Sequence, residues 1–359
     1  MQQFGDIYRG KRVLLTGHTG FKGSWLALWL HNMGALVTGV SLASDGATNH
    51  FELLDLDVKD LRVDVRDIGA LTAVFDRVMP EIVFHLAAQP LVRRSYKDPL
   101  ETWSTNVMGT ANILELSRKT DTVRSVVVIT TDKCYENFEW PWGYRETDRL
   151  GGHDPYSASK AGAELVVSSY RKSFFGVDGA PLVATARAGN VIGGGDWSED
   201  RLVPDLIRSV INKDPLTIRS PNSTRPWQHV LDSLCGYLML GERLLAGDKS
   251  CADSWNFGPE AISNVTVQNV LLKIQAYWPE IKWSVGPEAE LHEGNLLYLD
   301  SSKARSSLGW NPILTLDAAL LATTDWYQSY VSGELIVSKN QLNDYFLSAL
   351  KLDAKWIRP

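Results

Sequence analysis

The stretch TGHTGFKG constrains this chain more than any other, because it places Gly17, Gly20 and Gly23 in a GxxGxxG spacing. The apolar run RVLLTG before it is typical of a buried strand, and FKGSWLALWLHNMG after it indicates a helix that stops at Gly34. Such glycines permit a tight turn and close approach of the backbone to a pyrophosphate, and the helix N-terminus offers amide donors. In this βαβ context the stretch predicts a dinucleotide-binding loop rather than an ordinary strand–helix turn.

Short apolar runs continue to alternate with helix-like segments as far as about residue 193. The runs that we expect to be strands cover residues 35–42, 60–65, 81–88, 123–130 and 182–193. Strands that alternate with helices favour a parallel sheet covered on both faces. The predicted fold class is therefore α/β, with a Rossmann-type doubly wound parallel sheet and a smaller mixed α/β C-terminal lobe.

The alternation breaks after about residue 192, which suggests two domains. We expect a dinucleotide-binding domain over residues 1–190 and a discontinuous substrate domain over residues 191–359, with segments near 228–260 returning to the first. Two long helices are predicted on one face of the sheet, over residues 95–120 and 155–175. Asp154 and Pro155 suit the N-cap and first position of the second helix.

Composition narrows the class of protein. The net charge of −6 over 359 residues gives no sign of a nucleic-acid surface. The three cysteines, Cys134, Cys235 and Cys251, form no CxxC pair, so neither a disulfide framework nor a metal site is expected. No stretch approaches the ~18 apolar residues that span a bilayer, and no signal-peptide core is visible. We expect a cytoplasmic protein.

The second predicted strand ends without the acidic residue that usually holds the adenosine ribose. Ser41 stands at that place, and no arginine follows to bind a 2′-phosphate, so NAD is favoured over NADP. His18 and Lys22 are candidates to touch phosphate or ribose. Asp64 is expected either to reach the adenine or to cap the next helix. His85 is expected to be a packed residue.

The stretch YSASK places Tyr156 and Lys160 at i and i+4 on one helix face. A neighbouring ammonium and a positive nicotinamide ring favour the phenolate form of a tyrosine. Tyr156 is thus expected to accept a proton from a substrate hydroxyl while hydride leaves the same carbon. Lys160 is also expected to hold the nicotinamide ribose.

The motifs TGHTGFKG, YSASK, DVRD, HLAAQ and TNVMGT, with the later blocks GNVIGGGD and RPWQHVLD, resemble the extended short-chain dehydrogenase/reductase family that acts on nucleotide sugars. The resemblance covers nearly the whole chain. It implies that the cofactor is bound by Gly17, His18, Thr19, Gly20, Phe21, Lys22, Gly23, Asp64, Val65, Leu86, Ala87, Ala88, Gln89, Asn106, Thr130, Tyr156 and Lys160.

The stretch TTDKCYEN at the end of the fifth strand separates the branches of that family. In the 4,6-dehydratases this strand ends Thr-Asp-Glu, and here it ends Thr131-Asp132-Lys133. Dehydration needs an acid and a base besides the tyrosine. The resemblance implies that Thr131 forms a hydrogen bond to the oxygen on C4 of the hexose. It also implies that Asp132 protonates the hydroxyl group that leaves C6.

Lys133 departs from the commoner pattern, and two roles are open for it. Either Lys133 is the base that removes the hydrogen from C5 of the hexose, or it stays charged and stabilises the enolate that forms at C4. In the second case Glu136 is a candidate base.

Further residues are expected to hold a nucleotide sugar. The preference for a CDP-linked glucose rests on resemblance alone, because the sequence itself does not indicate the base. Arginines bind phosphate effectively through two parallel hydrogen bonds. The candidate substrate-binding residues are Arg93, Ser95, Thr131, Asn190, Arg201, Arg225 and Tyr298.

The family also implies an assembly, because the helices over residues 95–120 and 155–175 meet their twins in a four-helix contact. A homodimer or a dimer of dimers is expected. Two rival functions are a C4 epimerase, which needs no acid–base pair like Asp132 and Lys133, and a non-catalytic NAD-binding regulator, which would usually lose Tyr156 or Lys160.

Overall fold

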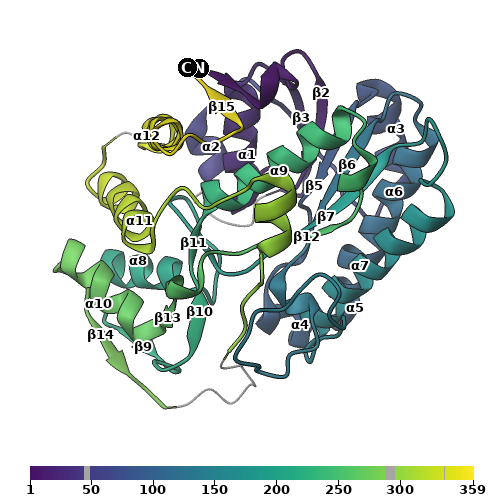
Figure 1. The fold of residues 1–359 in the computed structure, drawn as a ribbon. Coiled ribbons are helices and arrows are strands. Elements are labelled where there is room, and N and C mark those ends of the chain that lie inside the picture. The colour runs from purple at the N-terminus through teal and green to yellow at the C-terminus, as the bar shows by residue number, and fades with distance from the viewer. Residues whose placement is uncertain (44–48, 288–295, 335) are drawn as a thin grey trace.

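The computed structural model describes residues 1–43, 49–287, 296–334 and 336–359. Its centre is a parallel sheet of seven strands in the order β12-β7-β6-β5-β2-β3-β4 (Figure 1). The first strand along the chain in this sheet, β2, lies in the interior, so the order reverses direction between β2 and β5. Ligands of open α/β sheets bind at such a reversal, beyond the carboxyl ends of the strands. The strands are β2 (Arg12–Thr16), β3 (Leu36–Ser41), β4 (Lys59–Arg62), β5 (Ile82–His85), β6 (Ser125–Ile129), β7 (Leu182–Ala188) and β12 (Ser254–Phe257).

Helices cover both faces of this sheet. On one face lie α1 (Phe21–Asn32) and α9 (Val230–Leu245), and on the other lie α3 (Ile68–Val78), α6 (Gly109–Lys119) and α7 (Pro155–Ser173). Strand side chains alternate between the two cores: Val13 and Leu15 pack with α1 and α9, whereas Leu14 packs with α3 and α6. Near-continuous apolar runs are what a strand buried on both faces requires.

All six predicted strands are present, and the Rossmann-type fold class is confirmed. The seventh strand, β12, was not predicted. It pairs with β7 at the edge of the sheet, from Ser254 opposite Thr185 to Phe257 opposite Ala188. Its sequence SWNF is short and lacks a clear alternation, so it carries little strand signal of its own.

The two predicted helices differ in continuity. Helix α7 begins as expected, since Asp154 accepts a hydrogen bond from the Ser157 N–H at 3.0 Å and Pro155 is the first helical residue. The predicted helix over residues 95–120 is instead divided, because Pro99 cannot continue the helix before it. Its parts are α4 (Val92–Lys97), α5 (Pro99–Trp103), a π-helical turn over Ser104–Met108, and α6.

The C-terminal half adds a smaller lobe of helices and two-stranded sheets. Strand β8 pairs with β11, β10 with β13, and β9 with β14. The division at residue 190 stays a prediction. The remaining elements are α2 (His50–Leu54), β8 (Val191–Ile192), α8 (Leu202–Asn212), β9 (Leu216–Ile218), β10 (Thr224–Pro226), β11 (Gln228–His229), β13 (Asn264–Thr266), α10 (Val267–Tyr277), β14 (Trp283–Val285), α11 (Leu316–Val331) and α12 (Ser338–Lys351).

The two ends of the chain lie side by side (Figure 1). Strand β1 (Gln2–Gln3) pairs antiparallel with β15 (Ile357–Arg358), and the Phe4 N–H donates to the Trp356 carbonyl at 2.7 Å. The Phe4 and Trp356 rings stack with centroids 5.1 Å apart, and both contact Trp29 of α1. The terminal strands thus close one side of the core beneath α1.

Asp232, on the first turn of α9, connects this helix to the C-terminal segments. Its carboxylate accepts hydrogen bonds from the Ile313 N–H at 2.7 Å and from the Tyr345 hydroxyl of α12 at 2.9 Å. Asp232 is fully buried, and burial raises the pKa of its carboxyl to about 7.

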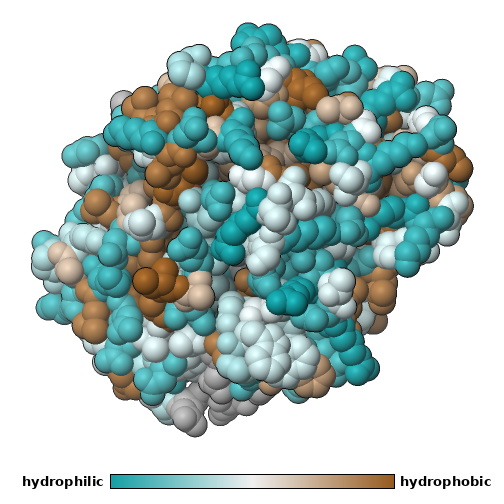
Figure 2. Space-filling model, viewed as in Figure 1, coloured by the Kyte–Doolittle hydropathy of each residue, from teal (hydrophilic) through white to brown (hydrophobic). Residues whose placement is uncertain are grey.

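Among the described residues, no helix is long and apolar enough to cross a membrane. The face in Figure 2 is largely hydrophilic. Its hydrophobic residues gather mainly on the left, near α11 and α12, and smaller groups lie along the right-hand edge near α6 and α7.

Candidate active site

The glycine loop after β2 has the geometry that a dinucleotide cradle requires. Gly17 has φ +75°, and a Cβ there would lie 2.7 Å from the Ala87 nitrogen of the loop after β5. A Cβ at Gly23 would lie 2.0 Å from the Gly17 carbonyl oxygen. Within the described parts of the chain, a Cβ on Gly20, which precedes α1, would lie near only the Gly17 oxygen, at 3.3 Å. The loop therefore packs tightly against neighbouring backbone at Gly17 and Gly23, whereas Gly20, the N-cap of α1, is less crowded.

The side chain of His18 does not face this cradle. Its ring is fully buried, lies where a Cβ on Gly39 would be, and bonds Asp60 Oδ1 through Nε2 at 2.9 Å. Burial lowers the pKa of His18, although Asp60 opposes this. The ring therefore holds the loop against β3 and β4, and a contact of His18 with phosphate or ribose stays a prediction for its backbone.

Two other residues at the loop also have protein partners. The hydroxyl of Thr19 forms a hydrogen bond with that of Ser41. Ser41, which stands where an acidic residue usually holds the adenosine ribose, therefore supports the loop. Lys22 donates to the Tyr237 hydroxyl of α9 at 3.3 Å. Burial lowers the pKa of Lys22 to about 7. Phe21 is buried at the start of α1.

Asp64 follows β4, but it does not cap the next helix. Its carboxylate accepts hydrogen bonds from the backbone N–H and guanidinium of Arg66, whereas Asp67 caps α3 by accepting from the Ala70 N–H. The capping alternative for Asp64 is thus wrong. Val65, next to it, is buried beside Gly109 of α6.

The loop after β5 is held by side chains rather than left open. Its Leu86, Ala87 and Ala88 are each half-buried. Asn106 accepts from the Gln89 N–H at 2.8 Å and donates to both the Gln89 carbonyl and the Ser159 hydroxyl. Asn106 and Gln89 therefore fasten this loop to α7. His85 is buried between Thr16 and Thr110, as expected of a packed residue.

Tyr156 and Lys160 lie on the first turns of α7, and both are more than nine-tenths buried. Burial raises the pKa of Tyr156 to about 12, although a hydrogen bond with Thr131 and the charge of Arg201 oppose it. Burial also lowers the pKa of Lys160 to about 8, against the attraction of Glu164. The Lys160 ammonium donates to the Ile129 carbonyl at 3.2 Å. The expected lowering of the tyrosine pKa is therefore not present in the protein alone.

One residue, Thr130, separates β6 from the segment Thr131-Asp132-Lys133, in which Thr131 is the N-cap of a single 3₁₀ turn over Asp132–Cys134. Asp132 is 3% exposed and accepts a hydrogen bond from the Thr131 hydroxyl at 3.0 Å. Burial raises the pKa of Asp132, against the charges of Lys133, Arg225 and Lys22. A carboxyl whose pKa is raised keeps its proton at higher pH, as a general acid must.

Two arginines of the second lobe and the glycine that follows β7 lie near this segment. Arg201 pairs with Asp196 at 2.9 Å, and its charge acts on the pKa of Tyr156. Arg225, on β10, acts on the pKa of Asp132. A Cβ on Gly189 would lie 2.8 Å from Asp132 Oδ2, so the chain that enters the second lobe passes directly beside the acid.

Some of the other predicted substrate-binding residues lie near Asp132, and others do not. Asn190 follows Gly189 and therefore lies close to Asp132; its carbonyl accepts from the Gln228 N–H. Arg93 reaches across to the second lobe, where it pairs with Asp200 at 3.0 Å. Ser95 is fully buried and donates to the Val92 carbonyl, so the structure does not place it at this site.

Two further candidates point elsewhere. Tyr298 donates to the Pro141 carbonyl at 2.7 Å, in the loop after β6. Glu136, the alternative base, pairs with Arg149 at 2.8 Å on the outer side of that loop.

Four residues that the sequence analysis missed form hydrogen bonds to residues in or next to the site. They are Asp196, Tyr237, Glu164 and Arg187, whose partners are Arg201, Lys22, Thr130 and Tyr135 respectively. One signal was available, because Arg187 is a charged residue inside the apolar strand LVATARA, and a buried charge needs a partner.

A doubly wound sheet, a glycine cradle and a buried Tyr156–Lys160 pair define a dinucleotide-dependent enzyme of the extended short-chain dehydrogenase/reductase class. Residues 14–323 match the family described as GDP-mannose 4,6 dehydratase. The chain belongs to this family.

Individual relatives agree with this assignment. A CDP-glucose 4,6-dehydratase of Salmonella typhimurium is 47% identical over 350 residues, which cover 95% of this chain and 97% of the relative. A dTDP-glucose 4,6-dehydratase of Haemophilus influenzae is 25% identical over 344 residues, or 88% of this chain and 97% of the relative. Among solved structures, an epimerase from Methanothermobacter thermautotrophicus matches with a TM-score of 0.81 at 23% identity, over 91% of this chain and 96% of that one. An NAD-dependent NDP-hexosamine 5,6-dehydratase matches with a TM-score of 0.74 at 25% identity, over 89% and 98%.

Proposed function

We propose that this protein is a CDP-D-glucose 4,6-dehydratase, which converts CDP-glucose to CDP-4-keto-6-deoxyglucose and water. The observation that carries the proposal is the buried Asp132 beside Lys133, next to Tyr156 and Lys160. An epimerase needs no such acid–base pair. The Salmonella enzyme is 47% identical over 95% of this chain, which supports both the reaction and the substrate.

NAD is the proposed cofactor, and the residues present fit it. A Cβ would crowd the backbone at Gly17 and Gly23, whereas Gly20 is uncrowded at the N-terminus of α1, where a pyrophosphate is stabilised. The related NDP-hexosamine dehydratase is NAD-dependent. Lys160, from α7, is proposed to hold the nicotinamide ribose. The chemistry that NAD supplies when bound is removal of a hydride from C4 of the hexose and its return to C6.

The chain's own residues move the protons. Tyr156 accepts the proton of the C4 hydroxyl, whose oxygen Thr131 holds, so that a ketone forms at C4. The ketone acidifies the C5 hydrogen, which Lys133 removes, while Asp132 gives its proton to the departing C6 hydroxyl. Lys133 returns a proton to C5 at the end. The proton that Tyr156 took balances the one that Asp132 gave, so one water is lost overall.

Lys133 is the preferred C5 base, because Glu136 is already paired with Arg149. Asn190, Arg201 and Arg225 are proposed to bind the diphosphate.

The decisive experiment is mass spectrometry of the purified protein with NAD⁺ and, in parallel, CDP-, dTDP-, UDP- and GDP-linked glucose. Loss of one water from CDP-glucose alone is expected. Water loss from a different sugar nucleotide would keep the reaction and overturn the substrate. Epimerised hexose with no loss of mass would overturn the dehydratase assignment.

We further propose a homodimer or a dimer of dimers. Its contact is expected on the outer face of α5, the π-helical turn and α7, where exposed apolar side chains gather. The largest of them are Leu100, Trp103, Met108 and Leu165.

A further inference from the structure

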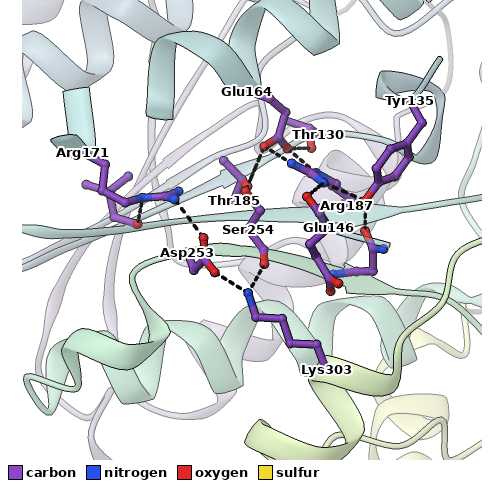
Figure 3. A network of polar contacts seen from close by, with 12 residues as sticks. Thr130, Tyr135, Glu146, Glu164, Arg171, Thr185, Arg187, Asp253, Ser254 and Lys303 are labelled. Atoms are coloured by element: carbon purple, nitrogen blue, oxygen red, sulfur yellow. Dashed lines mark hydrogen bonds and ion pairs between the residues drawn. The ribbon is translucent and has the colours of Figure 1, made fainter. Parts of the chain in front are cut away.

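Glu164 lies one helical turn beyond Lys160 on α7, and both of its carboxylate oxygens are engaged (Figure 3). Oε1 accepts from the Thr130 hydroxyl at 2.5 Å and from Arg187 Nε at 2.9 Å. Oε2 accepts from the Thr185 hydroxyl at 2.8 Å and from Arg187 Nη2 at 2.7 Å. One carboxylate thus connects α7 to the ends of β6 and β7.

Arg187 continues the connection on its other side. Its Nη1 donates to the Tyr135 hydroxyl at 2.6 Å, and that hydroxyl donates to Asn256 Oδ1 at 2.8 Å (Figure 3). Glu164 and Arg187 are each 2% exposed. Burial raises the pKa of Glu164, but the Arg187 charge and the hydrogen bonds from Arg187, Thr130 and Thr185 together outweigh it and hold that pKa below its ordinary value.

The proposed acid and base lie between these two attachments along the chain. Thr130, bound by Glu164, precedes Thr131-Asp132-Lys133, and Tyr135, bound by Arg187, follows it after Cys134. A single ion pair therefore forms hydrogen bonds to residues on both sides of Thr131-Asp132-Lys133. Its carboxylate belongs to α7, the helix that carries Tyr156 and Lys160.

Stability alone is a weak reason for such a pair. Removing two charges from water costs about as much as their attraction returns, and hydrophobic replacements are often as stable. Catalysis supplies a stronger reason, because a displacement of about 1 Å can slow a reaction on the order of 100-fold.

We infer that the Glu164–Arg187 ion pair, through Thr130 and Tyr135, positions Asp132 and Lys133 against Tyr156 for the elimination step. This inference rests on the proposed function. Glu164, Arg187, Tyr135 and the hydroxyl of Thr130 act here as positioning groups, which set the place of the acid and base through the main chain.

The test is Tyr135→Phe, with Tyr144→Phe as its matched control. Both tyrosines are buried and their rings stack 5.3 Å apart, but the Tyr144 hydroxyl bonds Asn137 and the Phe138 N–H instead of Arg187. Single turnovers with CDP-glucose would measure C4 oxidation by the near-ultraviolet absorbance of reduced nicotinamide, and water loss by quenched mass spectrometry.

For Tyr135→Phe, water loss is expected to slow about 10- to 100-fold while C4 oxidation and KM stay close to wild type. Tyr144→Phe should change neither step. Equal slowing of both steps, equal slowing in the control, or an unchanged Tyr135→Phe would each overturn the inference.

A second pair keeps the test decisive if Tyr135→Phe does not fold. Thr130 and Thr185 donate equivalent hydrogen bonds to Glu164, but only Thr130 adjoins the catalytic segment. Thr130→Val should slow water loss and Thr185→Val should not; the same loss in both contradicts the inference. A wild type that releases no water contradicts the proposed function instead.

Discussion

At the scale of the residue, burial shifts the pKa of two groups that the proposed reaction uses. It raises the pKa of Asp132, so this carboxyl is a proton donor. It also raises the pKa of Tyr156 to about 12, so the protein alone keeps the phenol protonated. The positive charge that lowers this pKa must then come with the cofactor, which couples proton removal to an occupied site.

The variant Asp132→Asn should slow water loss about 10²- to 10⁴-fold, because the C6 hydroxyl then leaves without a proton. In the wild type, water loss should fall as the pH rises through the raised pKa of Asp132, since the ionised form cannot donate. The variant should lack this fall. Single-turnover mass spectrometry across pH would check both points, and a variant with wild-type rates would contradict the assigned acid.

Lys133→Met should abolish the exchange of the C5 hydrogen with deuterated solvent, because no base remains to remove it. Glu136→Gln is the matched control and should exchange normally, since Glu136 is paired with Arg149. Proton NMR of the product reports the exchange. The reverse result, with exchange lost only in Glu136→Gln, would reassign the base and leave Lys133 as the group that stabilises the enolate.

At the scale of the element, the glycine loop depends on the fit of α1 beneath it. Gly23→Ala would force a Cβ to 2.0 Å from the Gly17 oxygen, so the loop must open and NAD binding should fall at least tenfold. Gly69→Ala, in the first turn of α3, meets only Asp67 Oδ1 at 3.4 Å. This control should bind NAD normally and gain up to about 1 kcal/mol of stability. Calorimetric titration with NAD would measure both variants.

Asp232 makes the attachment of α9 to the C-terminal segments depend on pH. Its carboxyl keeps its proton in the folded chain up to about pH 7, whereas in the unfolded chain it releases the proton near its ordinary value of 3.8. Folded protein therefore binds the extra proton, and the free energy of unfolding should fall by about 4 kcal/mol as pH rises through this interval.

Asp232→Asn should remove that share of the pH dependence, because an amide does not titrate. Urea unfolding of wild type and variant at several pH values between 4 and 8 would measure the difference. A difference between the two proteins that does not change with pH would show that Asp232 does not titrate in this range.

The elements that the sequence predicted well are those whose signal is local. The glycine loop, Asp154 before α7, and the six apolar strands all follow from neighbouring residues. β12 could not be recognised, because its stability comes from pairing with β7 far away in the sequence. The same reason explains the site: Lys133 and Tyr156 carry local motifs, whereas the Arg187–Tyr135 contact joins residues that only the fold brings together.

At the scale of the whole molecule, the proposed dimer face can be separated from other exposed apolar side chains. Leu165→Glu, on α7, places a charge in the proposed contact and should reduce the mass in solution to that of one chain. Ile262 in the second lobe is more exposed, at 83% against 60% for Leu165, yet Ile262→Glu should leave the assembly intact. Light scattering would decide; a single-chain wild type would contradict the proposed assembly.

The pairing of β1 with β15 also has a consequence for how the chain is made. Gln2 and Gln3 leave the ribosome about 350 residues before their partners Ile357 and Arg358. Domains generally fold as units during translation, N-terminal part first. Here Phe4 and the side of α1 that it contacts lack their cover until Trp356 emerges, so this side of the Rossmann sheet can close only after residue 356 has left the ribosome.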